Sequence, residues 1–472
     1  MYIKKTKIVA TIGPATESVE MLEKLFHQGV NVVRLNFSHG DFEEHGGRIT
    51  RTRAISQKLD IPVAILQDLS GPKIRIGEFY QERVILPEGG KFMLTTEKIV
   101  GDETKAYVNY EKLPSEVKAG QIIFLDDGKK KLIVEKVAGE KVHCKILVGG
   151  ECKGRRGVNV PGAYLSISCL TDKDKKDLQF GIKQGVDYMA LSFVRRPDDV
   201  RELREILKKN KASDIKIISK IETQEAIDNI DEILEVSDGL MVARGDLAIE
   251  IPAEQVPFWQ KSMIKKANKV GKPVITATQM LESMISSPVP TRAEVSDVAN
   301  AIFDGTDAVM LSEETTLGRY PLQAIEVMYR VAVHTEKTRD AGHFLTREHL
   351  CSKDLQDSLA YAAINIARET CATALVAYTT TGRTPRFLSR YRPETPLFIL
   401  TDNQKTYNQM ALGFACYPIL TTEPESLQNF GEVARKMLLA KKLVKKGETV
   451  ILITGLPLGG KSGANMVFAE KI

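Results

Sequence analysis

Residues 215–252 read IKIISKIETQEAIDNIDEILEVSDGLMVARGDLAIEIP. Twice in this stretch, a short apolar run that contains β-branched residues stops abruptly at charged residues. The first run leads to Lys220 and Glu222, and the second leads to Arg244 and Asp246. This pattern is typical of parallel strands that are buried along their length and chemically active at their C-terminal ends.

The charged residues at these two strand ends suit phosphoryl chemistry. Two carboxylates from neighbouring strand ends, Glu222 and Asp246, are ligands of the kind that Mg²⁺ takes together with substrate oxygens. A lysine beside them, Lys220, suits a phosphoryl group in transfer. The alternative is a buried ion pair beneath a loop. Because two adjacent strand ends carry complementary charges, we favour the catalytic interpretation.

The alternation of strands and helices extends along most of the chain and predicts an α/β fold. Outside one interrupted region, eight strands are predicted at residues 6–12, 31–36, 62–68, 187–193, 215–220, 239–243, 273–277 and 307–311. Eight βα units predict a closed (β/α)₈ TIM barrel, with a doubly wound open sheet as the alternative. Polar residues at or just past the strand ends favour the barrel, whose active sites lie at that face. They are Arg34, Asn36, Asp68, Lys220, Glu222, Asp246, Thr278, Glu313 and Glu314.

Two segments depart from the barrel pattern. From about Gly71 to Ser168, short segments bearing Val and Ile are broken by glycines, which predicts a small inserted β-barrel domain. Residues 340–353 are polar without periodicity and predict a linker, after which strands and helices indicate an open α/β domain. The predicted division is therefore a barrel at 1–70 and 169–340, an inserted β lid at 71–168, and a C-terminal regulatory domain at 341–472.

The bulk composition limits the class of protein. The chain has 472 residues, of which 43% are hydrophobic and 27% charged, and a net charge of +5. This mild basicity fits small anionic substrates better than nucleic acid. The six cysteines form no Cys-x-x-Cys motif and are interpreted as free thiols of a reducing compartment. No stretch approaches the length of a membrane span, so we expect a cytoplasmic protein without a membrane partner.

Two glycine-containing loops near the C-terminus are candidates for phosphate binding. Residues 455–462, GLPLGGKS, match the P-loop pattern, but the following residues look extended, whereas a P-loop needs a helix there. We therefore reject a nucleotide P-loop. Thr379, Thr380, Thr381, Gly382, Arg383 and Thr384 follow a predicted strand and open a helix, which is a better anion seat. The two loops together predict one effector-phosphate site, and two ordinary surface turns are the alternative.

Several motifs along the chain resemble those of the pyruvate kinase family. They are TKIVATIGP at 6–14, NVVRLNFSHG at 31–40, GPKIR at 71–75, SKIE at 219–222, MVARGDLAIEIP at 241–252 and ATQML at 277–281. Their order, together with the inserted β domain and the C-terminal domain, makes the resemblance specific over the whole chain. It implies transfer of a phosphoryl group from phosphoenolpyruvate to ADP, followed by protonation of the enolate to pyruvate.

The resemblance also implies roles for individual residues. Glu222 and Asp246 would hold Mg²⁺, with Mn²⁺ as an alternative, and Lys220 would neutralise the phosphoryl group with support from Arg34. The amides of Gly245 and Asp246 would receive the substrate carboxylate, and Arg75 would contribute to substrate binding. Thr278 would lie near the enolate, and Ser312 and Glu314 in the proton-relay region. The β domain would close over the site as a lid and exclude water, with Asp127 reaching the closed site.

One departure from the family pattern concerns potassium. Potassium-dependent members resemble Asp-Thr-Lys-Gly-Pro-Glu-Ile-Arg where this chain has DLSGPKIR at 68–75, so that Lys73 replaces a glutamate. An ammonium near the cation region of Asn36, Ser38, Asp68 and Leu69 would do the work of K⁺. A K⁺ ion 4 Å from it would be repelled by about 4 kcal/mol at an effective dielectric near 20. We therefore predict an enzyme that does not require K⁺, resembling the potassium-independent bacterial type without an extra C-terminal domain.

Other features leave alternatives open. Ala248 and Glu313 stand where the family usually has glycine, and no consequence for kinetics is predicted. The rival functions are a Mg²⁺-dependent carbon–carbon lyase, which would not need Lys220, and a non-catalytic sugar-phosphate sensor, which would lack the carboxylate pair. His45 is interpreted as a surface residue. The family resemblance implies a homotetramer regulated by a sugar phosphate or AMP.

Overall fold

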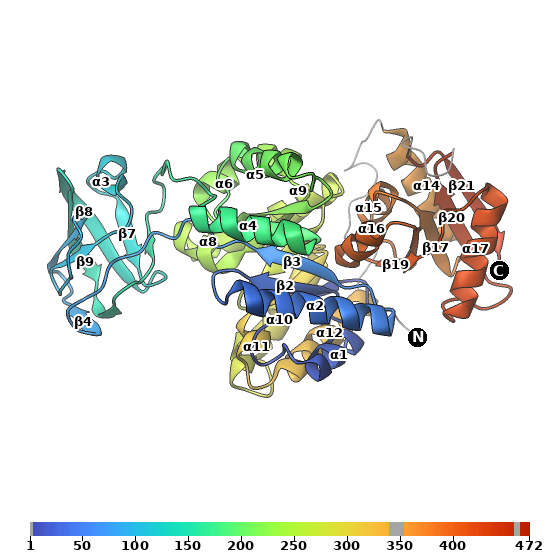
Figure 1. Cartoon of the computed structure of the whole chain (residues 1–472), viewed down its shortest axis with the longest axis horizontal. Helices are drawn as coiled ribbons and strands as arrows, with labels where there is room; N and C mark the ends of the chain where they lie inside the picture. Colours follow the sequence, from blue (N-terminus) through green and yellow to red (C-terminus); the bar gives the residue numbers. More distant parts are fainter. Residues whose placement is uncertain (1–2, 339–353, 457–462) are drawn as a thin grey trace.

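The protein consists of three bodies arranged in a row. The structure is a computed structural model that describes residues 3–338, 354–456 and 463–472. Figure 1 shows an all-β body at one end, a βα barrel in the middle and an α/β body at the other end. The predicted linker at 340–353 lies outside the described residues.

The middle body is a closed barrel of eight parallel strands, as predicted. Its strands are β1 (Lys7–Thr11), β2 (Val32–Asn36), β3 (Ala64–Asp68), β12 (Tyr188–Leu191), β13 (Lys216–Ile221), β14 (Gly239–Ala243), β15 (Val274–Ala277) and β16 (Ala308–Leu311). Neighbours in the barrel follow the chain order, and β1 pairs with both β2 and β16 to close the ring. The doubly wound open sheet is therefore excluded.

Helices surround the barrel strands. They are α1 (Val19–His27), α2 (Phe42–Leu59), α4 (Asp172–Gln184), α5 (Pro197–Lys209), α6 (Gln224–Asp228), α7 (Ile230–Val236), α8 (Arg244–Glu250), α9 (Val256–Lys269), α10 (Arg292–Phe303), α11 (Glu313–Thr316) and α12 (Pro321–Thr338), with 3₁₀ turns at Ala253–Gln255 and Glu282–Ile285. Both ends of α4 are specified by nearby residues. Thr171 and Asp174 form a capping box at its start, and Gly185 ends the helix in the left-handed conformation.

The structure corrects three details of the sequence interpretation. Between the fifth and sixth barrel strands the sequence predicts a single helix over residues 223–235, but the structure divides it at Asn229. The Asn229 side chain donates to the carbonyls of Arg195 and Glu225 and so competes with helical bonding. The strand expected over 187–193 ends at Leu191. His45, predicted at the surface, is buried. Its ring stacks on that of Phe37, with the ring centroids 4.0 Å apart.

The interior of the barrel is filled with small and aliphatic side chains. They include Val9, Val32, Ala64, Ala190, Ile218, Met241, Ile275 and Met310. The same cluster contains Ala411 and Leu412, which belong to a 3₁₀ turn of the C-terminal body (Met410–Leu412). The C-terminal body therefore closes one mouth of the barrel, and the loops that follow the strands lie at the opposite mouth.

The inserted body is all-β apart from one short helix, α3 (Leu113–Glu116). Its strands are β4 (Arg83–Leu86), β5 (Lys91–Thr95), β6 (Lys105–Tyr107), β7 (Ile122–Leu125), β8 (Lys130–Ala138), β9 (Lys141–Val148), β10 (Gly150–Lys153) and β11 (Val158–Asn159). They form a six-stranded sheet, β11-β7-β8-β9-β5-β6, and a two-stranded sheet, β10-β4, around their own apolar core. The prediction of an inserted β domain after the third strand is confirmed.

The C-terminal body is an open α/β sheet, as predicted. Its strands are β17 (Ala374–Tyr378), β18 (Leu397–Thr401), β19 (Cys416–Leu420), β20 (Thr449–Thr454) and β21 (Met466–Lys471), and its helices are α14 (Leu355–Glu369), α15 (Arg383–Ser389), α16 (Gln404–Gln409) and α17 (Leu427–Ala440). The sheet order is β19-β18-β17-β20-β21, with β21 antiparallel to β20. The chain after the P-loop-like segment thus forms a strand, which agrees with the rejection of a P-loop; residues 457–462 of that segment lie outside the described residues.

Two whole-chain features complete the description. No helix in the described ranges 3–338, 354–456 and 463–472 is long and apolar enough to cross a membrane. The five cysteines in the same ranges are free thiols, and only Cys371 is exposed.

Candidate active site

A buried charged cluster lies at the C-terminal mouth of the barrel. Arg34 comes from β2, Asp68 from the end of β3, and Lys220 from β13, and Glu222 directly follows β13. Asp68 and Glu222 are buried, with 1% of each residue exposed. The structure therefore brings together four residues that the sequence analysis selected from three separate strands.

Lys220 is the centre of this cluster. Its Nζ lies 3.3 Å from Oδ1 of Asp68 and 3.0 Å from Oε1 of Glu222, and it donates a 2.7 Å hydrogen bond to Oγ of Ser192. Burial lowers the pKa of Lys220, but Asp68 and Glu222 outweigh burial and raise its pKa above the ordinary lysine range. The ammonium is therefore a permanent positive charge at a fixed position.

Arg34 and Asp68 form a second buried pair. Nε of Arg34 donates to Oδ2 of Asp68 at 2.6 Å, and its Nη1 donates to the hydroxyl of Thr11 at 3.0 Å. Burial acts to raise the pKa of Asp68, but Lys220 and Arg34 outweigh it and lower that pKa below its usual value. Asp68 is therefore a stable anion that holds two cations side by side.

Glu222 and Asp246, the predicted ligands of a divalent cation, are close enough for the charge of Asp246 to act on Glu222. Oε2 of Glu222 accepts the Phe193 amide at 2.6 Å, whereas its buried Oε1 faces the Lys220 ammonium at 3.0 Å. Burial raises the pKa of Glu222, and the neighbouring charge of Asp246 adds to this effect. A hard cation would relieve both costs, so the donor set fits Mg²⁺. In the described ranges, no group of three or more Asp, Glu, His or Cys side chains is placed to hold a metal, so the remaining ligands would come from substrate or water.

The loop after β15 carries a strained threonine. Thr278 has φ +71°, in the left-handed region that β-branched residues avoid. Its hydroxyl accepts the Gly245 amide at 2.8 Å and lies 2.6 Å from the carbonyl of Ala277. Arg244 turns away from the site, where it donates to the Thr278 carbonyl and pairs with Asp297. Thr278 and Gly245 thus lie together, and Arg244 supports them from behind.

Ser312 and Glu314 follow β16. Oε2 of Glu314 accepts the Ser312 amide at 2.7 Å, and Oε1 accepts the Leu281 amide at 3.2 Å. Burial raises the pKa of Glu314, although these amides oppose the shift. Glu314 therefore joins the loop after β16 to the loop after β15.

Lys73 and Arg75 are directed to the β body. Nζ of Lys73 lies 3.7 Å from Oδ1 of Asp127, which is on the β7–β8 turn. Arg75 donates to the carbonyl of Arg155 at 3.1 Å, and its amide donates to Asn109. In the described part of the chain neither side chain pairs with the Lys220 cluster. The structure thus places both residues at the connection between barrel and β body.

The proposed monovalent-cation region offers few free oxygens. The amide of Ser38 donates to Oδ1 of Asn36 at 3.1 Å, and Ser38 itself is exposed. The Leu69 side chain is buried and apolar, and its carbonyl accepts the Ser192 hydroxyl at 2.7 Å. Asp68 is already paired with Arg34 and Lys220.

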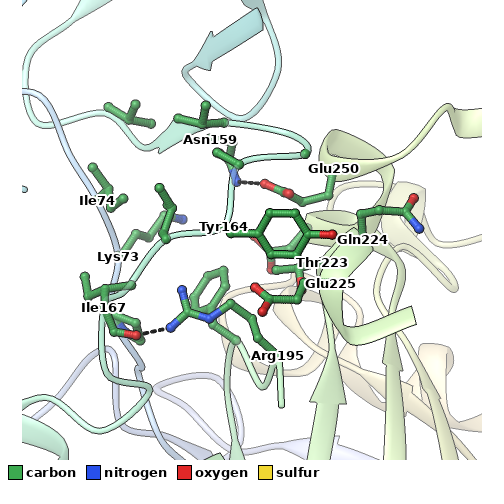
Figure 2. A pocket seen from close by; sticks show the side chains of 18 of the residues that line it. Lys73, Ile74, Asn159, Tyr164, Ile167, Arg195, Thr223, Gln224, Glu225 and Glu250 are labelled. Atoms are coloured by element: carbon green, nitrogen blue, oxygen red, sulfur yellow. Dashed lines mark hydrogen bonds between the residues drawn. The ribbon is translucent and has the colours of Figure 1, made fainter. Parts of the chain in front are cut away.

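A cleft lies between the β body and the barrel beside Asp246. Figure 2 shows the loop that carries Asn159 and Tyr164 facing the barrel segments that carry Thr223, Glu225 and Glu250. Nδ2 of Asn159 donates to Oε1 of Glu250 at 3.3 Å across the cleft. Burial raises the pKa of Glu250 to about 7.

Three residues that contact this site are not among those predicted from the sequence. Ser192 and Phe193 bind Lys220 and Glu222, and Glu250 contacts the β body. Ser192 directly follows a barrel strand, so the rule that selected Lys220 and Asp246 could have found it. Nothing in the sequence marks the amide of Phe193 or the contact of Glu250, because both depend on tertiary geometry.

The candidate effector loop lies in the C-terminal body, remote in the sequence from the barrel site. Oγ1 of Thr379 accepts the amides of Gly382 at 3.0 Å and Thr381 at 3.4 Å, which closes the loop before α15. Thr380 accepts a hydrogen bond from Thr406, and Arg383 pairs with Asp354 at 3.6 Å. The loop is therefore held by the Thr379 side chain and by contacts with Thr406 and Asp354.

Comparison with known proteins identifies the family of this fold and site. The profile "Pyruvate kinase, barrel domain" matches residues 3–325, and "Pyruvate kinase, alpha/beta domain" matches residues 357–468. The chain belongs to the pyruvate kinase family. The resemblance inferred from the motifs is confirmed, and the chain is a phosphotransferase of this family.

Curated relatives cover almost the whole chain. "Pyruvate kinase" of Geobacillus stearothermophilus is 46% identical over 472 residues, covering 98% of this chain and 80% of the relative. The protein of the same description from Bacillus licheniformis is 45% identical over 456 residues, covering 96% and 78%. That from Staphylococcus aureus strain MRSA252 is 46% identical over 468 residues, covering 98% and 80%. These matches favour the kinase over the lyase and the sensor.

Proposed function

We propose that the chain transfers the phosphoryl group of phosphoenolpyruvate to ADP and yields pyruvate and ATP, the last step of glycolysis. The observation that carries this proposal is the position of Lys220, a buried ammonium between the carboxylates of Asp68 and Glu222 at the open mouth of the barrel. Phosphoryl transfer needs mainly positioning and charge stabilisation, and this cluster supplies both without a protein nucleophile.

The cations bind and orient the phosphoryl group. Lys220 faces the group in transfer, and Arg34, held by Asp68, supports the same phosphate from β2. Glu222 and Asp246 would hold Mg²⁺ or Mn²⁺, which would supply a further positive charge for the phosphate oxygens. Because Asp68 keeps both side-chain cations in place, no reorganisation is needed when negative charge develops.

The remaining site residues bind the carboxylate of the substrate and deliver the proton to the enolate. The amides of Gly245 and Asp246 receive the substrate carboxylate, and Arg75 assists from the β body. The Thr278 hydroxyl, fixed by the strained backbone, lies at the enolate face, with Ser312 and Glu314 as the proton-relay group. The β body acts as a lid over the site, and Asp127, on the β7–β8 turn, reaches the closed site.

A pair of lysines on one strand tests the reaction and its centre. Lys220→Met should lower kcat by at least about 1,000-fold, because the charge acts on the transition state in a water-poor site. Lys216→Met is the matched control, since Lys216 is on the same strand at the other mouth, where it lies 3.8 Å from Asp238. Pyruvate formation is measured with Mg²⁺ present. Equal activity of the two variants would refute the proposal.

We also propose that the enzyme does not require K⁺. Support comes from the sequence, where Lys73 replaces the glutamate of potassium-dependent members, and from the cation region, where Leu69 offers no side-chain oxygen and Asp68 is paired with two cations. Activity should be full when tetramethylammonium replaces K⁺ at constant ionic strength. Lys73→Glu should create a K⁺ requirement, whereas Lys129→Glu, the same charge change at an exposed site on the β7–β8 turn, should not. A strong K⁺ stimulation of the unaltered enzyme would exclude the idea.

The effector, the assembly and the domain division complete the proposal. We infer that a sugar phosphate or AMP binds at residues 379–384, that the enzyme is a cytoplasmic homotetramer, and that its domains divide at 70, 168 and 340. Separate apolar cores in the barrel, the β body and the C-terminal body support the division. Activation by AMP or ribose 5-phosphate should disappear in Thr379→Ala, which opens the loop, while basal kcat stays the same.

A further inference from the structure

A two-residue turn after β12 contacts both the lysine and the metal carboxylate of the site. We infer that the Ser192–Phe193 turn is a positioning element that sets the Lys220 ammonium and the Glu222 carboxylate in their working geometry. This inference rests on the proposed function of Lys220 and Glu222. Its support comes from the hydroxyl of Ser192, the backbone of Phe193 and the packing behind them.

The Ser192 hydroxyl has a fixed polarity. It lies 2.7 Å from the Leu69 carbonyl, which can only accept, so the single hydroxyl proton is directed there. Its lone pairs therefore face Nζ of Lys220, which donates to them at 2.7 Å. The other Lys220 contacts in the described residues are charged, at 3.0 and 3.3 Å. Ser192 is thus the shortest and only neutral contact that the described residues make with the ammonium, and it fixes its direction.

The backbone of Phe193 has an unusual conformation. Its φ of +54° is unfavourable for a residue with a side chain. In this conformation its amide donates a 2.6 Å hydrogen bond to Oε2 of Glu222, and its carbonyl is 2.8 Å from Sγ of Cys169. The amide occupies Oε2 of Glu222, and Oε1 is left to face the Lys220 ammonium, 3.0 Å away. The strained backbone therefore decides which carboxylate oxygen faces a cation.

Close packing holds the turn in place. Gly71 has φ +67°, and a Cβ on it would lie 2.9 Å from Cδ2 of Phe193 and 3.0 Å from Cβ of Ser192. Gly71 and Cys169 belong to the two chain segments that join the barrel to the β body. Both connections therefore press on the turn that holds Lys220 and Glu222.

The hydroxyl is tested by a matched pair of serines. Ser192→Ala should lower kcat about tenfold with KM values for both substrates within about twofold, because a hydrogen bond to a charged group is lost. Ser192→Thr keeps the hydroxyl and should restore most of kcat. Ser219→Ala is the control, since Ser219 is buried on β13 beside Lys220 but bonds to Ser237 at 2.6 Å.

Two substitutions of Phe193 test the role of its backbone. A backbone role and a space-filling role of the side chain predict opposite orders of Mn²⁺ affinity for these two variants. Phe193→Gly adopts a positive φ without cost, whereas Phe193→Val strongly resists it. If the turn positions Glu222, the valine variant should bind Mn²⁺ at least about fivefold more weakly than the glycine variant in an electron paramagnetic resonance titration. If the ring only fills space, the glycine variant should be the weaker.

The outcomes separate this inference from the proposed function. An active Lys220→Met enzyme would overturn the proposed function and this inference with it. If Lys220→Met is inactive, but Ser192→Ala keeps wild-type kcat, or Ser219→Ala loses as much, or Ser192→Thr is as impaired as alanine, the inference alone is wrong. Stronger Mn²⁺ binding by Phe193→Val than by Phe193→Gly would also overturn it.

Discussion

At each mouth of the barrel a cation is buried against an aspartate. The two clusters differ in how many partners their carboxylate oxygens have. At the N-terminal mouth, Arg392 of the C-terminal body binds both carboxylate oxygens of Asp307 at 2.9 and 2.8 Å. It also donates to Asn268 and to the carbonyls of Gly305 and Ser389. At the C-terminal mouth, Lys220 holds Asp68 and Glu222, and its ammonium is the partner of Oε1 of Glu222, 3.0 Å away.

The difference indicates which cluster maintains the fold and which carries out chemistry. Asp307 also accepts the amides of Val274 and Phe414, so the N-terminal cluster joins the C-terminal body to the barrel with its polar groups paired. In the C-terminal cluster, Oε1 of Glu222 has the Lys220 ammonium as its partner, 3.0 Å away, and burial raises the pKa of the Glu222 carboxylate. Burial of this carboxylate costs folding free energy until a ligand arrives. We therefore expect substitutions at the two mouths to act mainly on stability and on activity, respectively.

The largest effect on stability is expected at the N-terminal mouth. Arg392→Met leaves Asp307 buried without its cation and should lower the free energy of unfolding by about 3–5 kcal/mol. The kcat of the folded fraction should stay unchanged, because the catalytic mouth is untouched. Urea denaturation and assays at low temperature measure the two quantities. Arg201→Ala, an exposed arginine paired with Asp198, is the control and should cost about 0–1 kcal/mol.

The second effect is expected at the C-terminal mouth, where a substitution should lower activity and not stability. Glu222→Gln should lower kcat by about 100-fold or more, since it removes a carboxylate from the metal site. Burial raises the pKa of Glu222, so in the wild type this group destabilises the fold increasingly as pH rises above its unfolded pKa near 4.3 and through the raised value. At pH 8 without divalent cations the variant should therefore be at least as stable as wild type.

Mg²⁺ addition sharpens this second test. Mg²⁺ should raise the Tm of the wild type, because it binds the folded state, and should raise that of Glu222→Gln much less. Glu336→Gln provides a comparison at the N-terminal mouth, where the Glu336 carboxylate accepts the amides of Lys5 and Thr6. It should lose stability and keep the Mg²⁺ shift. An equal Mg²⁺ shift in all three proteins would contradict the assignment of the metal site.

A smaller effect is expected from a buried lysine at the N-terminal mouth. Burial lowers the pKa of Lys7 to about 8, and its Nζ donates to the Cys416 carbonyl at 2.6 Å. Below pH 8 both folded and unfolded chains carry the charge, so the full cost of burial is present; the cost disappears as pH rises from 8 towards 10.5. Lys7→Met should gain about 1 kcal/mol at pH 7 and less at pH 9.5. Lys58→Met, at an exposed lysine, should show no such pH dependence.

The smallest effect concerns the contact between the lid and the barrel. Asn159→Ala removes the 3.3 Å hydrogen bond to Glu250 and should change kcat by less than about twofold. It should increase hydrogen exchange of the amides in residues 158–167, because one tie across the cleft is lost. A loss of kcat as large as that of Glu222→Gln would mean that Glu250 belongs to the catalytic group.

Much of the fold could be predicted because it depends on local patterns. The eight apolar runs mark buried parallel strands, and helices such as α4 carry their own capping signals. The break at Asn229 was missed, since a side chain that competes with the helix is also common in intact helices. The end of β12 at Leu191 was missed because Ser192 and Phe193 have the composition of a strand.

The sequence by itself determined the barrel, the inserted β domain and the charged residues at the strand ends. Strand ends of a closed parallel barrel meet at one mouth, so Arg34, Asp68, Lys220 and Glu222 had to come together whatever their separation in the chain. Only the tertiary structure decided how they are held. The amide of Phe193, the hydroxyl of Ser192 and the opposite mouth closed by Arg392 depend on backbone angles and contacts between distant segments, and no local pattern records these.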